Sequence, residues 1–112
     1  MPRDAASLLD IFEAGQLIQE FIDGIGEEVF LGDRKTQSAV LHQILILGEA
    51  TKRISPEYRQ AHPEIPWRLM AGMRDVVVHA YESVDLAEVW KTASQDIPSL
   101  MAQIESLIPS RK

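Results

Sequence analysis

The sequence predicts an all-α protein, an antiparallel up-and-down four-helix bundle with short extra helical turns. Apolar residues recur every three or four positions along almost the whole chain of 112 residues. No linker, repeat or low-complexity tract interrupts this pattern, and the connections between its periodic segments are short, which favours antiparallel neighbours. The length suits one helical domain over residues 1–112.

The first helix is expected from about Asp4 to Asp23, with glycines just beyond it as stop signals. Its apolar residues follow alternating three- and four-residue steps and give it a wide buried face. These residues are Leu8, Ile11, Gly15, Ile18, Ile22 and Ile25.

The second long helix follows a short stretch, EEVFLGD, and begins after Asp33, a plausible N-cap residue. It runs to about Ile54 with a broad apolar face that includes Ile44 and Leu47. Gly48 lies in its middle, where glycine costs about 1 kcal/mol relative to alanine. Another backbone or side chain is therefore expected to approach closely at Gly48.

A third main helix is expected from about Trp67 to about Tyr81, after short helical turns that begin at Ser55 and Pro56 and break at the next prolines. Met70, Met73, Val77 and Ala80 mark its core side. Its three consecutive valines also suit a strand. We predict helix because no second strand is evident, and a lone strand leaves its backbone groups unpaired.

The last helix starts at a capping box formed by Asp85 and Glu88. Pro98 removes one helical hydrogen bond, so a kink is expected there, while the apolar stripe continues beyond it. The stripe contains Leu86, Trp90, Ala93, Ile97, Leu100, Ile104 and Leu107. A small bundle with several wide apolar faces can bury one of them in a twofold homodimer.

The composition excludes several classes of function. There are no cysteines, which excludes disulfides, cysteine zinc sites and cysteine nucleophiles. The net charge of −6 argues against general nucleic-acid binding, although a small local basic site could still bind nucleic acid. The first residues lack the apolar run of a signal peptide, and no stretch approaches the roughly 20 apolar residues of a membrane span. We therefore expect a cytoplasmic protein without membrane contact.

The stretch MRDVVVHAYESVD places Arg74, His79 and Tyr81 within eight residues. Arginine suits phosphate, and histidine can move a proton to or from a ribose 2′-hydroxyl or a leaving oxygen. Together they suit metal-free cleavage of a phosphodiester. A hydrogen-bond network at a helix end is the commoner use of such a trio, so spacing alone leaves both interpretations open.

Helical geometry complicates the reaction centre. At about 100° per residue, Arg74 and Tyr81 lie about 20° apart around the helix, whereas His79 is displaced by about 140° from Arg74. A distorted helix end, a wrapping arginine side chain or a second copy of the helix across a dimer could each complete the site.

Several motifs together resemble one family. RDVVVHAY is followed by ESVD and EVW, and preceded by ILGEATKRIS and HPEIPWRLMAGMRD. In this order they closely resemble the HepT-like toxins of the HEPN superfamily, from about residue 33 to residue 108. The resemblance implies an all-helical homodimer whose two motifs meet in a cleft, and a metal-independent ribonuclease in which Arg74 and His79 carry out cleavage. Asp75 is part of the same pattern, in which asparagine is more usual.

The resemblance also implies a partner, a minimal nucleotidyltransferase antitoxin that transfers AMP from ATP to Tyr81. The added bulk and negative phosphate would exclude an RNA phosphate from the site. ATP is then the substrate of the partner, and no cofactor or metal is expected in this chain. The RNA substrate, tRNA or mRNA, stays open, and DNA is not expected. The alternative is a catalytically inactive helical module that docks the nucleotidyltransferase.

Glu49, in the GEA element, could pair with Arg74 across two helices and orient it, or it could be a solvated charge. His42 lies two turns before Glu49, but two ligands rarely make a metal site. Trp67 and Trp90 are expected as core or interface anchors. His62 is expected in a loop. Three cations could rim an RNA cleft or be ordinary surface charges: Lys52, Arg53 and Arg68.

Overall fold

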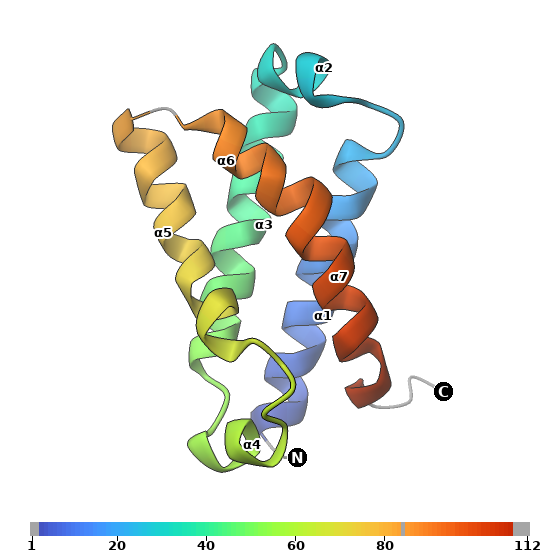
Figure 1. The fold of residues 1–112 in the computed structure, drawn as a ribbon, viewed down its shortest axis with the longest axis vertical. Helices are drawn as coiled ribbons and strands as arrows, with labels where there is room; N and C mark the ends of the chain where they lie inside the picture. Colours follow the sequence, from blue (N-terminus) through green and yellow to red (C-terminus); the bar gives the residue numbers. More distant parts are fainter. Residues whose placement is uncertain (1–2, 84, 109–112) are drawn as a thin grey trace.

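The computed structural model describes residues 3–83 and 85–108, and the side chains of residues 79–83 are outside the described part. The described residues form helices and turns without a strand, so the predicted all-α class is confirmed. The chain runs up through α1 (Arg3–Ile22), down through α3 (Arg34–Lys52), up through α5 (Trp67–Ser83) and down through a C-terminal helical run (Figure 1). The antiparallel order of the four long segments follows the prediction.

The packing order of the helices decides which surfaces stay open. Helix α3 lies between α1 and α5 and packs extensively on both. The C-terminal run contacts α5 at its beginning and α1 further along, so it crosses the bundle diagonally (Figure 1). Within the described part of the chain, α3 is the one long helix that packs closely on α5 away from this crossing, and much of the α5 surface faces outward.

The predicted capping residues start their helices. Asp33 accepts a hydrogen bond from the Thr36 amide at 3.2 Å. Asp85 accepts one from the Glu88 amide at 3.2 Å and begins α6 (Leu86–Lys91). These side chains satisfy amide groups that have no partner in the first turn of a helix.

Two short helices close the ends of the bundle. Helix α4 (Pro56–Ala61) is the expected short turn, and the Ser55 hydroxyl caps it by accepting from the Tyr58 amide. Helix α2 (Glu27–Leu31) was not predicted. Its single buried residue, Phe30, packs on Trp90 with 5.3 Å between ring centroids.

The expected irregularity at Pro98 takes the form of a π-helical turn, η1 (Thr92–Asp96), between α6 and α7 (Ile97–Ile104). The wider turn lets the helical path continue through Pro98 as predicted. The Trp90 carbonyl accepts a hydrogen bond from the Ser94 hydroxyl at 2.6 Å. A 3₁₀ turn, η2 (Glu105–Leu107), ends the run.

The core lies between the four long segments and is almost entirely aliphatic. Most of the predicted core residues are buried, among them Leu8, Ile11, Ile18, Ile44, Leu47, Met70, Met73, Val77, Ala93, Ile97, Leu100 and Ile104. The valine triplet is helical, but only Val77 reaches the core fully, and Val78 is 43% exposed. None of the described helices has both the length and the apolar character required to cross a membrane.

Candidate active site

Helices α3 and α5 touch each other closely at Gly48. A methyl group at this position would lie 3.2 Å from the Arg74 amide nitrogen and 3.3 Å from the Arg74 Cβ. A side chain here would require the α5 backbone to shift by a few tenths of an ångström, so glycine allows the closest approach of the two helices. The close approach predicted for Gly48 is present, and the residue it brings against α3 is Arg74.

The next residue along α3 reaches the same arginine. Glu49 Oε2 lies 3.3 Å from Arg74 Nε, so the ion pair predicted between the two helices is present. Both side chains are about half exposed, at 44% and 47%. The contact uses only Nε, and a guanidinium has two further nitrogen atoms with which it can hold a phosphate or carboxylate.

Helix α5 carries the other two motif residues. It stays α-helical through Ser83, two residues beyond Tyr81, so its backbone contains no break between Arg74 and Tyr81. The side chains of His79 and Tyr81 are outside the described part. Because the helix is regular, the offset of about 140° between Arg74 and His79 applies to it directly.

Asp75 is exposed on the outward side of α5. Asp75 and His79 are four residues apart, which makes them neighbours on a helix surface. Asp75 therefore belongs to the side of α5 that carries His79, about 100° around the helix from Arg74.

The tryptophans pack as anchors, as predicted. Trp67 is 7% exposed and donates a hydrogen bond from Nε1 to the His62 carbonyl at 2.9 Å. Trp90 is packed against the core. His62 ends α4 and stacks on Tyr58, whose pKa is raised by burial and by the charges of Asp4 and Glu64.

No group of three His, Asp or Glu side chains suited to a metal ion exists among the described residues. His42 is exposed on α3. The three cations proposed as a possible rim, Lys52, Arg53 and Arg68, are all exposed.

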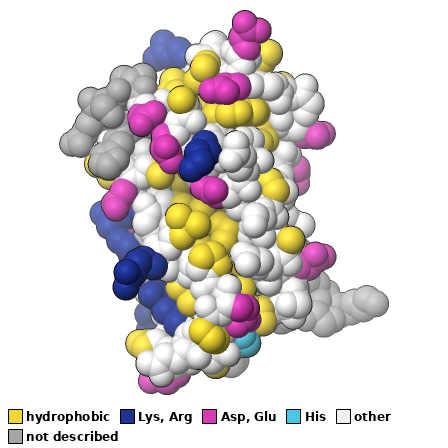
Figure 2. All heavy atoms as spheres, viewed as in Figure 1, with side chains coloured by type: hydrophobic (Ala, Val, Ile, Leu, Met, Phe, Trp, Pro, Cys, Tyr) yellow, Lys and Arg dark blue, Asp and Glu magenta, His cyan; other side chains and the backbone are white. Residues whose placement is uncertain are grey.

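An apolar groove runs beside the candidate site, and sequence reasoning missed it. It lies between α5 and the start of the C-terminal run, with a volume of about 260 Å³, and hydrophobic side chains are visible in this region of Figure 2. Leu69 on its edge is 52% exposed. The sequence contains a signal for this groove, because Leu69 is apolar but does not lie on the core face formed by Met70, Met73 and Val77.

Replacing Gly48 with alanine should reduce both stability and any activity that depends on Arg74. The new methyl group meets the α5 backbone, which yields less easily than a side chain. This clash opposes the roughly 1 kcal/mol that alanine contributes to helix propensity. Thermal unfolding and RNA cleavage would measure the two effects.

Gly15→Ala is the control, because the atoms nearest to its methyl group belong to the buried side chain of Met101, which can change its rotamer, and not to a backbone. Activity per folded molecule should fall for Gly48→Ala and stay near wild type for Gly15→Ala. A Gly48→Ala protein that is more stable and fully active would show that the helix contact does not position Arg74.

Comparison with known proteins gives a consistent result. The family model "HepT-like: Ribonuclease HepT-like" matches residues 11–107. A protein of Thermococcus cleftensis named "Probable ribonuclease HepT" is 52% identical over 100 residues, which cover 89% of this chain and 91% of the relative. Two Methanocaldococcus jannaschii proteins named "Putative RNase" are 36% and 31% identical, over 92% and 89% of this chain and 85% and 92% of their own. No solved structure matches.

Proposed function

Because the chain belongs to the HepT-like family of ribonucleases, we propose that it is the toxin of a two-component system and cleaves RNA without a metal. The observation that carries the proposal is the placement of Arg74. Gly48 lets α5 pack closely on α3 at Arg74, and Glu49 contacts Nε of the Arg74 guanidinium at the surface. An exposed cation held in this way is prepared to bind a phosphate group.

The proposed chemistry is an attack of the ribose 2′-oxygen on the neighbouring phosphorus. A bond forms between these atoms, and the bond to the 5′-oxygen of the next nucleotide breaks. His79 takes the proton from the 2′-hydroxyl while water supplies a proton to the leaving 5′-oxygen, or His79 protonates the leaving oxygen while water takes the 2′-hydroxyl proton. Arg74 stabilises the negative charge on the phosphoryl oxygens, and Asp75, beside His79 in the helical register, helps to orient the imidazole.

A homodimer is proposed because α5 is regular and Glu49 holds Arg74 toward α3, so that Arg74 and His79 of one chain are directed to different sides of the helix. Arg74 and His79 differ by about 140° around a regular helix. Helix α5 also carries two exposed apolar side chains, Leu69 and Val78, at 52% and 43% exposure. They lie about 180° apart around the helix, on the two flanks of its outward side. Such residues are suited to a second copy of the chain. Each active site would then combine Arg74 of one subunit with His79 of the other.

Mixing two inactive variants tests this arrangement. A dimer of one Arg74→Ala subunit and one His79→Ala subunit keeps one complete site, formed by the arginine of one subunit and the histidine of the other. If the subunits exchange at random, half of the dimers are mixed, and each mixed dimer has one complete active site out of two. The mixture should therefore recover about a quarter of wild-type activity. RNA cleavage is measured before and after mixing.

Each variant alone serves as the control and should stay inactive. A mixture that forms mixed dimers but recovers no cleavage would reject the shared site. A wild-type dimer that cleaves no RNA and still binds a nucleotidyltransferase would support the alternative, an inactive docking module. The negative net charge and Asp75 are the features that favour this alternative.

The proposed regulation completes the system. A minimal nucleotidyltransferase antitoxin transfers AMP from ATP to Tyr81 in the cytoplasm. The modification places a negative phosphate on the helix that carries Arg74, two turns away on nearly the same side. The AMP phosphate would occupy the position of an RNA phosphate and would repel the RNA by its negative charge.

A further inference from the structure

Positive charge is concentrated in one part of this acidic chain. Residues 50–74 contain five of the eleven Lys and Arg residues but only two of the seventeen Asp and Glu residues. This segment forms the end of α3, α4 and the first half of α5. Figure 2 shows Lys and Arg side chains gathered along the lower part of the α5 edge of the molecule. The chain as a whole repels RNA, whereas this surface attracts it.

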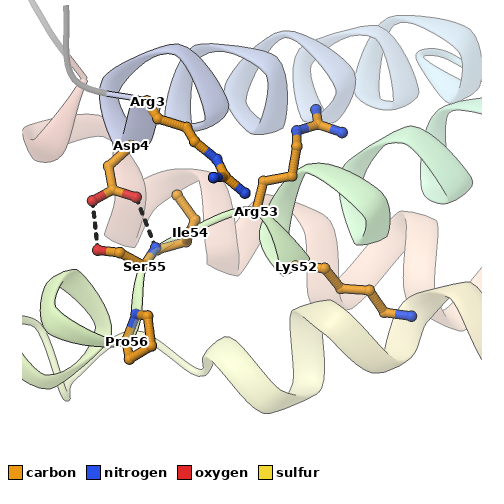
Figure 3. A pocket seen from close by; sticks show the side chains of 7 residues that line it. All are labelled: Arg3, Asp4, Lys52, Arg53, Ile54, Ser55 and Pro56. Carbon is orange, nitrogen blue, oxygen red and sulfur yellow. Dashed lines mark hydrogen bonds between the residues drawn. The ribbon is translucent and has the colours of Figure 1, made fainter.

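The positive surface begins at the candidate active site. Helix α3 touches Arg74 at Gly48, and Lys52 lies one helical turn beyond this contact. The distance along the helix axis from Gly48 to Lys52 is about 6 Å. Figure 3 shows the Lys52 side chain extended toward α5, on the side of α3 that faces Arg74's helix. Lys52 is exposed and is therefore available to solvent and ligand.

The surface continues around the end of α3. Arg53 and Arg3 point into the same region between α1 and α3 (Figure 3). They line a hollow of about 280 Å³ together with Lys52 and Ser55. Arg53 Nη2 lies 3.3 Å from Asp10 Oδ2, but both side chains are about half exposed, and such a pair exchanges easily for a phosphate contact.

The acidic residue in this hollow is directed to another partner. Asp4 accepts hydrogen bonds from the Ser55 amide and the Ser55 hydroxyl, each at 2.7 Å. These hydrogen bonds hold the pKa of Asp4 below its usual range. Its carboxylate fixes α1 to the start of α4 and stays negatively charged, but the three cations that line the hollow, Arg3, Lys52 and Arg53, outnumber this one acidic residue (Figure 3).

We propose that a single RNA strand leaves the active site along this surface, with its phosphates bound first by Lys52 and then by Arg53 and Arg3. The proposal rests on the ribonuclease function proposed above and extends its substrate site. The tryptophans are committed to packing, so binding here uses the backbone of the RNA and no base stacking by tryptophan. It should therefore depend on salt and not on sequence.

Binding of a labelled single-stranded RNA to the inactive His79→Ala protein tests the proposal, at several salt concentrations. In this background Lys52→Gln combined with Arg53→Gln should weaken binding about tenfold and reduce the slope of log K against log salt by about 1.4, or about 0.7 for each lost phosphate contact. Arg34→Gln combined with Lys35→Gln is the matched control. These residues are exposed on the first turn of α3, at the opposite end, and the pair removes the same charge.

The control pair should leave the slope and the affinity near those of the His79→Ala parent. Equal loss in both pairs would show that only total charge matters and would overturn the proposed path, as would unchanged binding in the Lys52/Arg53 pair. Cleavage by the chain with His79 intact is measured separately. If the chain with His79 intact cleaves RNA but the Lys52/Arg53 variant binds RNA normally, only the proposed RNA path is wrong. If the chain with His79 intact does not cleave RNA, the ribonuclease proposal itself is wrong.

Discussion

Replacing Arg74 with alanine should lower the rate of RNA cleavage by about 10²- to 10³-fold, the usual cost of removing one donor that stabilises a developing negative charge. Melting temperature should change little, because the side chain is 47% exposed and its ion pair with Glu49 lies at the surface. Arg74→Lys should recover only part of the rate. Lysine keeps the charge but has no Nε to contact Glu49 while other nitrogens of the same planar group hold the phosphate. Cleavage under single-turnover conditions isolates this effect from product release.

Glu49 should act only through Arg74, and a double-mutant cycle can show this. Glu49→Gln removes the charge that holds Arg74 Nε at 3.3 Å and should lower the rate less than loss of the arginine does. In the Arg74→Ala background the same change should cost nothing further, because there is no guanidinium left to position. A purely structural role for Glu49 would instead give additive losses in both backgrounds.

Arg34→Ala provides the control for removal of one exposed arginine, since Arg34 lies in the first turn of α3 at the far end of that helix from Gly48. It should cleave RNA like the wild type. If Arg74→Ala and Arg34→Ala proved equally active, Arg74 would have no part in the reaction, and the proposed mechanism would have to be abandoned.

Periodicity, caps and breakers were sufficient to predict the four long segments because these features act locally. Asp33, Ser55 and Asp85 cap helices wherever the following residues are helical, so their roles could be inferred without tertiary structure. Gly48 was informative for a different reason. A glycine within a long helix is unfavourable unless something occupies the space of its side chain, and here the α5 backbone does so.

Other features depend on tertiary contacts that local sequence patterns do not predict. Helix α2 has only five residues, and Phe30 is its one buried residue, so it forms through packing on Trp90 and not through its own periodicity. The π turn before Pro98 is one of several ways to accommodate a proline, and packing selects among them. Val78 directly follows the core residue Val77, but it falls about 100° around the helix from Val77 and is 43% exposed.

The candidate site shows the same division. The Glu49–Arg74 pair could be predicted because the family motifs and Gly48 place the two residues on facing helices. The sequence predicts the angle between Arg74 and His79 because this angle follows from one regular helix. It does not predict the distance between the two groups, which in the proposed dimer depends on how two subunits meet. The composite site therefore stays a prediction, which the mixing experiment addresses.

Changing Tyr81 to phenylalanine should produce a toxin that the nucleotidyltransferase can no longer neutralise. In the proposed modification the Tyr81 oxygen attacks the α-phosphorus of ATP, the new O–P bond forms, pyrophosphate leaves, and the phenolic proton passes to solvent. Phenylalanine fills nearly the same volume but has no oxygen to accept the AMP. Cells that express both proteins should grow normally with wild-type toxin and stop growing with Tyr81→Phe, and intact mass should show one added AMP per chain for the wild type alone.

Tyr58→Phe is the decisive control, because the chain contains only two tyrosines. Tyr58 packs between His62 and Trp67, and burial together with the charges of Asp4 and Glu64 raises its pKa, which keeps its hydroxyl protonated. Tyr58→Phe should therefore still gain AMP and still be neutralised. If Tyr81→Phe gained AMP and Tyr58→Phe did not, the acceptor would be Tyr58. Repulsion of an RNA phosphate on the Arg74 side of α5 could then no longer explain the inhibition, because Tyr58 belongs to α4 at the end of the bundle.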